Sequence, residues 1–77
     1  MELYVVTDLS DPTGWPCGIF LSMDMAIDTV IKVNNYRTNS PVIWRNEGST
    51  SITYDDEENY MYKEYRITIF TPNEWQD

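Results

Sequence analysis

A chain of 77 residues has room for one domain with one hydrophobic core, so architectures that need a second domain are excluded. Thirteen acidic residues against five basic ones give a formal net charge of −8, which should repel nucleic acid and anionic membrane surfaces. The chain has no histidine, the commonest general base, and its single cysteine, Cys17, excludes an internal disulfide. No signal peptide or membrane-length apolar run stands out, and we expect a cytoplasmic protein.

The first half of the chain predicts two strands and a helix. Leu3–Val6 is rich in β-branched and aromatic residues, turn-forming residues follow at 10–14, and Gly18–Leu21 is a second short apolar run. Ser22 is suited to cap a helix, and residues 34–35, both asparagine, are expected to end it in the left-handed conformation. Apolar residues between these ends recur at helical spacing: Met23, Ala26, Ile27, Val30 and Ile31.

The second half predicts strands only. Val42–Arg45 has the composition of a short strand, and Ser51–Tyr54 and Tyr60–Phe70 are rich in tyrosine, threonine and isoleucine. Four carboxylates separate the last two segments, so a hairpin with an acidic tip is expected there, the alternative being a helix that begins near Asp55. Residues 1–77 should therefore form a single α+β domain, an antiparallel sheet of four to five strands with one amphipathic helix on one face, in the order β-β-α-β-β-β.

Two features indicate a surface that binds another macromolecule. Clustered carboxylates can contact surfaces rich in lysine and arginine, and tyrosine and tryptophan are enriched at protein interfaces. These criteria select nine partner-binding residues: Tyr54, Asp55, Asp56, Glu57, Glu58, Tyr60, Tyr62, Trp15 and Trp44. The acidic residues have a simpler interpretation as a solvated hairpin tip, and the two tryptophans have one as cover of the core.

The residue order resembles a group of small uncharacterised phage and bacterial proteins. The matching segments are Tyr4–Val6, the strand-to-helix junction Gly18–Ser22 and the closing strand Tyr65–Phe70. Asp24 stands near the position where the group carries a glutamate, and residues 37–59 match nothing in it. The resemblance implies a phage or mobile-element origin, where short acidic proteins often inhibit host machinery or host defence, and it implies no catalytic residues.

Enzymatic interpretations are weak, and we expect no cofactor and no bound metal. Cys17 has no histidine to activate it, and the acidic stretch lacks the ligand spacing and central glycine of a calcium loop. The leading hypothesis is an inhibitor that binds the basic surface of a host nucleic-acid-binding complex, such as a CRISPR effector, in the host cytoplasm without contacting nucleic acid itself. The alternative is a structural protein that self-assembles, for instance as a homodimer through an exposed strand edge.

Overall fold

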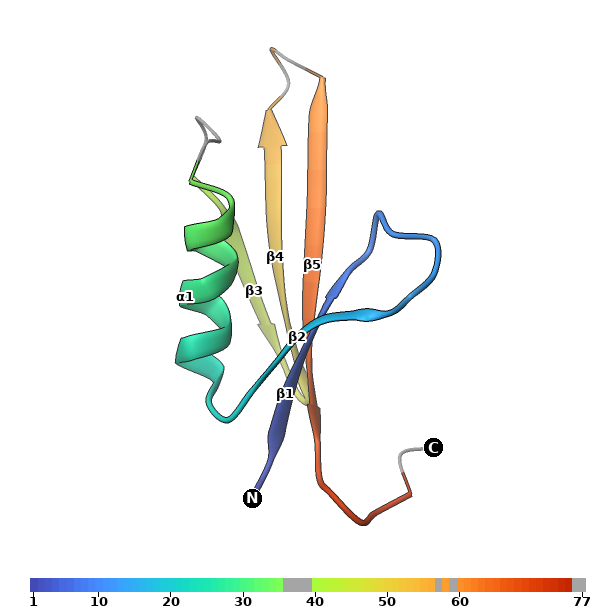
Figure 1. Cartoon of the computed structure of the whole chain (residues 1–77). Coiled ribbons are helices and arrows are strands. Elements are labelled where there is room, and N and C mark those ends of the chain that lie inside the picture. The colour runs from blue at the N-terminus through green and yellow to red at the C-terminus, as the bar shows by residue number, and fades with distance from the viewer. Residues whose placement is uncertain (36–39, 57, 59, 76–77) are drawn as a thin grey trace.

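The computed structural model describes residues 1–35, 40–56, 58 and 60–75, which form an antiparallel sheet with one helix against it (Figure 1). The elements are β1 (Leu3–Asp8), β2 (Pro16–Phe20), α1 (Met23–Val33), β3 (Val42–Asn46), β4 (Ser49–Asp56) and β5 (Met61–Phe70). The five strands lie in the order β2-β1-β5-β4-β3, and all neighbouring strands are antiparallel. The predicted α+β class and element order are confirmed.

Ser22 begins α1 as the sequence predicts. Its extended backbone stands at the cap position, and its Oγ accepts a hydrogen bond of 3.1 Å from the backbone N–H of Met25. This bond satisfies one of the N–H groups that a helix leaves without a partner in its first turn. Asp24 adds a negative charge at the positive end of the helix dipole.

The end of α1 differs from the prediction. Asn34 caps the helix with φ −107°, outside the left-handed region, so its conformational tolerance is not what stops the helix. Its side chain is buried instead, and Nδ2 donates a 2.8 Å hydrogen bond to the carbonyl of Val30. Asn34 therefore ties its side chain to the last turn of the helix, at the same Val30 carbonyl that accepts its backbone N–H.

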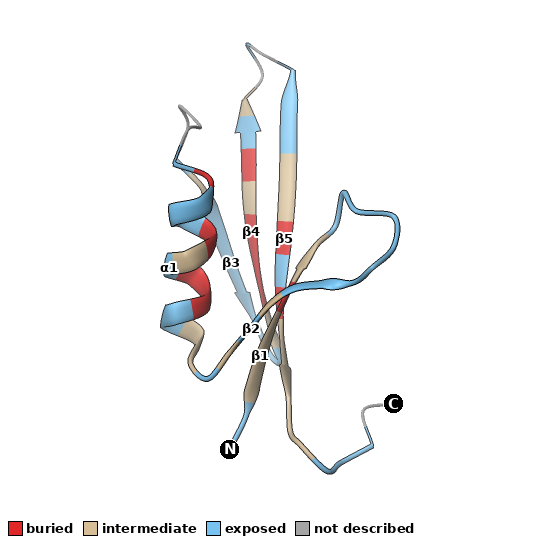
Figure 2. Cartoon of the chain, in the orientation of Figure 1, coloured by how far each residue is buried: buried red, intermediate tan, exposed pale blue. Residues whose placement is uncertain are grey.

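The core lies between α1 and one face of the sheet, where Figure 2 shows buried positions on both. Cross-strand register places Ile52 beside Tyr65 and Val6 beside Ile67 on that face. From the helix, Ala26, Ile27 and Val30 are buried as predicted, whereas Ile31, the last member of the expected stripe, is 38% exposed. The buried face of α1 therefore does not extend to Ile31, although the spacing of apolar residues predicts that it would.

The opposite face of the sheet has no helix against it in the described part of the chain. Along β5, Tyr65 and Ile67 face the core, and Glu64, Arg66 and Thr68 alternate with them on the opposite face. On β4, Thr53 continues this polar character beside Glu64, whereas Ser51, which pairs with Arg66, is buried. Hydroxyl and charged groups can remain hydrated there, so this face of the sheet does not require a second layer.

Several predicted boundaries shift by a few residues. β2 begins at Pro16, β3 extends to Asn46 and β4 already begins at Ser49. The alternative of a helix near Asp55 is wrong, because β4 continues through Asp56 and pairs with β5 up to that residue. The hairpin prediction for this part of the chain is confirmed.

Truncation of either fully buried isoleucine should destabilise the fold strongly. Ile52→Ala and Ile67→Ala each remove about 2–5 kcal/mol from the free energy of unfolding, because each leaves a cavity in a small core. Ile19→Ala makes the same deletion at a 60% exposed position and should cost less than about 1 kcal/mol. Urea unfolding measures all three, and equal losses at buried and exposed sites would contradict the assigned core.

Candidate binding surface on the hairpin arm

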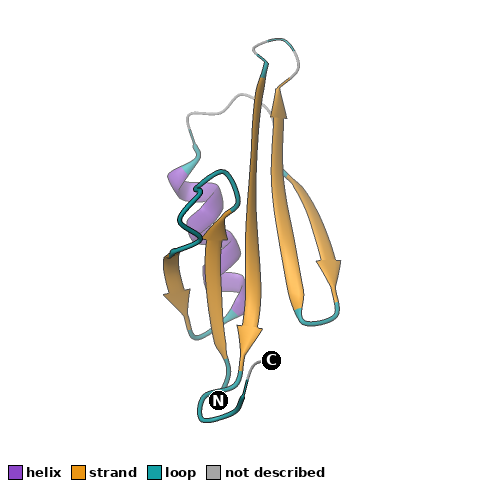
Figure 3. Ribbon diagram, turned by 90° about the vertical axis from the view of Figure 1, so that its right-hand side faces the viewer, coloured by secondary structure: helices purple, strands orange, loops and turns teal. Residues whose placement is uncertain are grey.

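The β4–β5 hairpin extends beyond the strands on either side of it. Pairing of β1 with β5 ends at Asp8 and Tyr65, and pairing of β3 with β4 ends at Val42 and Thr53. After one more backbone hydrogen bond, from Leu9 N–H to the carbonyl of Glu64, the described residues of β4 and β5 pair only with each other, up to Asp56 and Met61. We call the described residues of the range 54–63, namely 54–56, 58 and 60–63, the arm. Figures 1 and 3 show it projecting past the rest of the sheet, in line with a long axis of 44 Å against 25 and 20 Å.

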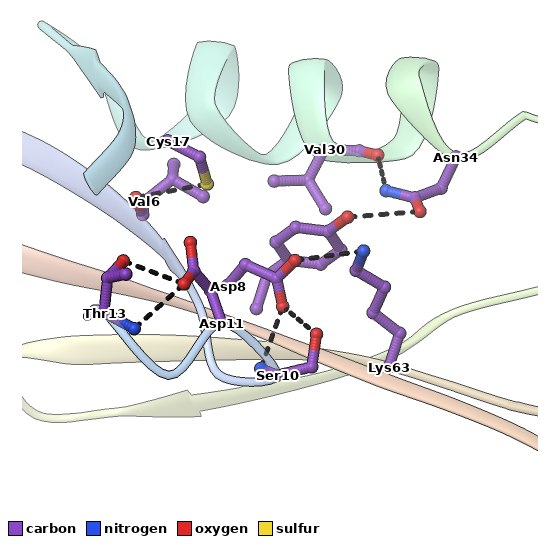
Figure 4. Close-up of polar contacts among 10 residues, drawn as sticks. Val6, Asp8, Ser10, Asp11, Thr13, Cys17, Val30, Asn34 and Lys63 are labelled. Atoms are coloured by element: carbon purple, nitrogen blue, oxygen red, sulfur yellow. Dashed lines mark hydrogen bonds and ion pairs between the residues drawn. The ribbon is translucent and has the colours of Figure 1, made fainter. Parts of the chain in front are cut away.

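An ion pair ties the base of the arm to the end of β1. Lys63 Nζ lies 3.0 Å from Asp8 Oδ2 and 5.4 Å from the centre of the Tyr65 ring (Figure 4). The other oxygen of Asp8 accepts hydrogen bonds from the backbone N–H and the hydroxyl of Ser10. Partial burial raises the pKa of Asp8, but the hydrogen bonds from Ser10 and Lys63 outweigh it and hold this pKa below the ordinary aspartate value.

A second link joins the same region to the helix. The hydroxyl of Tyr65 donates a 3.3 Å hydrogen bond to Oδ1 of Asn34, whose amide in turn bonds the last turn of α1. Tyr65 and Asn34 are 31 residues apart in the chain and both are buried. A two-stranded ribbon is only marginally stable alone, so these polar links and the ion pair help to hold the arm at a fixed angle to the domain.

The outer part of the arm exposes carboxylates and aromatic rings together. Asp55 and Glu58 are exposed and Asp56 is half-buried, while Glu57 lies outside the described residues. Tyr60 is 96% exposed and Tyr62 is 61% exposed. Asp55 pairs with Tyr62 and Asp56 with Met61, so each face of the ribbon carries one carboxylate beside one apolar or aromatic side chain.

Tyr60 also has an unusual backbone. Its φ of 52° lies in the left-handed region, which costs a residue with a side chain about 1–2 kcal/mol and which glycine adopts freely. A large, almost fully exposed aromatic ring therefore occupies a turn position where glycine would suit folding better. Backbone strain of this kind tends to occur at functional sites.

Tyr54 requires a correction. It was predicted as a contact residue, but it is 3% exposed and belongs to the core cluster. It faces the same side as Tyr65 because the register pairs it with Lys63, two positions earlier on β5. Alternation along β4 therefore assigns Tyr54 to packing, and Asp55 to the opposite, open face.

Trp15 and Trp44 are exposed, at 74% and 59%, but they do not join one surface. Trp15 precedes β2 and Trp44 lies in β3, and these strands form opposite edges of the sheet. Trp44 is on the open face, two positions from Val42, which pairs with Thr53 near the base of the arm. Of the two tryptophans, only Trp44 lies on the side of the sheet where β4 and the arm are found.

A small cleft lies between α1 and β2. Its volume is about 260 Å³, and apolar side chains such as Val6, Phe20 and Val30 form most of its lining. A Cβ at Gly18 would come within 2.7 Å of the Phe20 ring, so a larger residue there would require this ring to move. This volume is below the usual range for ligand pockets of about 300–1,000 Å³.

Two polar groups that border the cleft already have partners within the chain. Asp8 is held by Lys63, and the Cys17 thiol donates to the carbonyl of Val6 at 3.4 Å. Cys17 is the extra residue of a bulge between β1 and β2, and loss of hydration there raises the pKa of its thiol. A thiol with a raised pKa stays protonated and unreactive at neutral pH.

The negative charge of the chain is not confined to the arm. Described carboxylates also occur on α1, in the β1–β2 loop and at the β3–β4 turn, for example Asp28, Asp11 and Glu47. Asp55, Asp56 and Glu58 are nevertheless the densest group on a projecting element. Among the described residues, no three acidic or cysteine side chains gather as metal ligands would.

Comparison with protein-family models, with curated proteins and with solved structures found no match for this chain. The resemblance to small phage and bacterial proteins accordingly stays a prediction. A search of the described residues for a helix long and apolar enough to cross a membrane found none. The function must therefore be argued from the arm and its surroundings.

The ion pair at the base of the arm should contribute stability that depends on pH. Because the folded-state pKa of Asp8 is lowered, its contribution is complete above the ordinary aspartate pKa of about 4 and is lost as the pH falls through the lower folded-state value. Asp8→Asn keeps an oxygen for Ser10 and should cost about 0.5–1 kcal/mol at neutral pH. Urea unfolding should show this difference shrinking below about pH 4, whereas a constant difference would contradict the ion pair.

Proposed function

We propose that this protein is a binding module that docks its hairpin arm onto a basic surface of a protein partner. The observation that carries the proposal is the projection of the arm beyond β1 and β3, with exposed carboxylates and tyrosines at its outer end. A ribbon that extends from a folded domain can enter a groove that the flat sheet cannot. Carboxylates then speed association and select a basic site, and the tyrosine rings supply contact area.

The partner is proposed to be a nucleic-acid-binding complex. Such complexes hold phosphates with clusters of lysine and arginine, and carboxylates on a rigid arm can occupy the same cationic positions. The module would then compete with nucleic acid without binding it, in accordance with the net charge of −8. The resemblance narrows the proposal to inhibition of a host defence complex, such as a CRISPR effector, in the host cytoplasm.

Neutralising the arm should abolish partner binding while leaving the fold intact. The triple variant Asp55→Asn, Asp56→Asn, Glu58→Gln changes the formal net charge of the chain from −8 to −5. All three substitutions lie on the arm. The matched control Glu2→Gln, Asp28→Asn, Glu47→Gln makes the same change at exposed positions elsewhere. Capture from host lysate at low ionic strength should fail for the first and persist for the second, and the wild-type complex should weaken with added salt.

If both triple variants lose the partner to the same extent, net charge governs binding and the arm has no special part in it. Retention of the partner by the arm variant would contradict the proposal outright. Circular dichroism of both variants should match the wild type, because none of the substituted residues is buried in the core.

Tyr60 offers a test that separates binding from folding. Tyr60→Gly relieves the left-handed backbone and removes the exposed ring, so the free energy of unfolding should stay level or rise by up to about 1 kcal/mol. Partner affinity should fall by about tenfold or more, the effect of losing one interface tyrosine. If Tyr60→Gly is more stable and binds the partner as tightly as the wild type, the ring of Tyr60 takes no part in the contact.

A further inference from the structure

The two faces of the arm offer different surfaces to a partner. On the face that turns toward α1, Tyr54 is buried and Lys63 is held by its ion pair with Asp8. Asp56 and Met61 share this face, and Asp56 is half-buried. With a cation and no exposed aromatic ring among its described residues, this face of the arm is a poor match for a basic surface.

The open face of the arm carries carboxylates around an exposed ring. Asp55 pairs across the strands with Tyr62, and Glu64 follows Tyr62 on the same face, two positions along β5. Directly opposed side chains lie about 5 Å apart at Cβ and residues two positions apart about 7 Å, so both carboxylates are neighbours of the Tyr62 ring. The first described cation along β5 on this face is Arg66, beyond Glu64.

Tyr62 is both exposed and held in place. It is 61% exposed, and its hydroxyl donates a 3.1 Å hydrogen bond to Oε2 of Glu64. This hydrogen bond, together with some loss of hydration and the charges of Glu64 and Asp55, raises the pKa of the Tyr62 hydroxyl, which stays protonated at neutral pH. A ring held at its polar end loses little further freedom when a cation stacks on its face.

We infer that the arm contacts its partner with this open face, and that the Tyr62 ring stacks on an arginine side chain of the partner whose N–H groups bond Asp55 and Glu64. The inference rests on the proposed docking of the arm and specifies the contact. Charge complementarity selects a basic occupant and limits its extent, because the face is anionic up to Arg66, which would repel it. A guanidinium is planar, so it can stack on a ring while its N–H groups reach carboxylates at its edge. The ammonium of lysine is a strongly hydrated point charge that cannot do both.

Asp55 and Asp56 form a matched pair for a test, because they are adjacent on β4 and lie on opposite faces of the arm. Asp55→Asn and Asp56→Asn remove the same charge, so an effect of net charge alone would be equal in the two variants. We expect Asp55→Asn to weaken binding of an arginine-containing peptide by about fivefold or more and Asp56→Asn by less than about twofold. Tyr62→Leu keeps an apolar side chain without a ring face and should also weaken binding by about fivefold.

The probe is a capped peptide of about seven residues, lysine throughout except for one central arginine, titrated into the isotopically labelled full chain at about 0.02 M salt. An all-lysine peptide of the same length is the control and should bind less tightly by about threefold or more. Stacking should move the δ-methylene signals of the arginine upfield in the wild type and not in Tyr62→Leu. The carboxyl carbon signals of Asp55 and Glu64 should shift more than that of Asp56.

Equal weakening by Asp55→Asn and Asp56→Asn would overturn the inference, and so would an upfield arginine signal that Tyr62→Leu leaves unchanged. Either result would leave docking of the arm itself in place, provided that the shifts still concentrate there. Equal affinity for the two peptides would overturn the choice of arginine. Shifts spread over the whole molecule, with none concentrated in the arm, would instead contradict the proposed function.

Discussion

The register of the β4–β5 hairpin is the constraint on which the rest of this structure depends. Ile52, Tyr65 and Ile67 are buried on one face of the sheet, and their burial under α1 permits only one alignment of the two strands. A slip of β4 by one residue against β5 would turn Ile52 to the opposite face and Asp55 toward the helix side. Packing of the hydrophobic core therefore determines which side chains the arm exposes to a partner, although these side chains lie several residues away from the core.

The same register explains how an arm of two strands is supported. β5 belongs both to the core, through Tyr65 and Ile67, and to the arm, through Met61 and Tyr62. At the junction Lys63 bonds Asp8. Tyr65 bonds Asn34 at the end of α1. The arm is therefore an extension of a strand that also carries core residues, and it is tied to β1 and to the end of α1 at its base.

Much of this architecture follows from local sequence patterns. Ser22 and the apolar spacing from Met23 onward predict the helix and its start, and alternation in Tyr65–Phe70 predicts which face is buried. Tyr54 could not be placed in this way, because its burial is decided by its pairing with Lys63 on another strand. The role of Asn34 likewise depends on Tyr65, which is distant in sequence, and the projection of the arm depends on where β1 and β3 end. Pairing between distant segments is set by the whole fold, and no short window of sequence contains it.

The central claim is that the arm is a contact surface and that its charge does more than keep the protein dissolved. Titration of the isotopically labelled protein with a short lysine-rich peptide at low ionic strength, followed by amide chemical shifts, tests this without knowledge of the natural partner. Our account predicts shifts concentrated in the arm and fading as salt is added. Shifts of similar size at the carboxylates of α1, the β1–β2 loop and the β3–β4 turn would contradict it, because the arm would then be no more than one part of an evenly acidic surface.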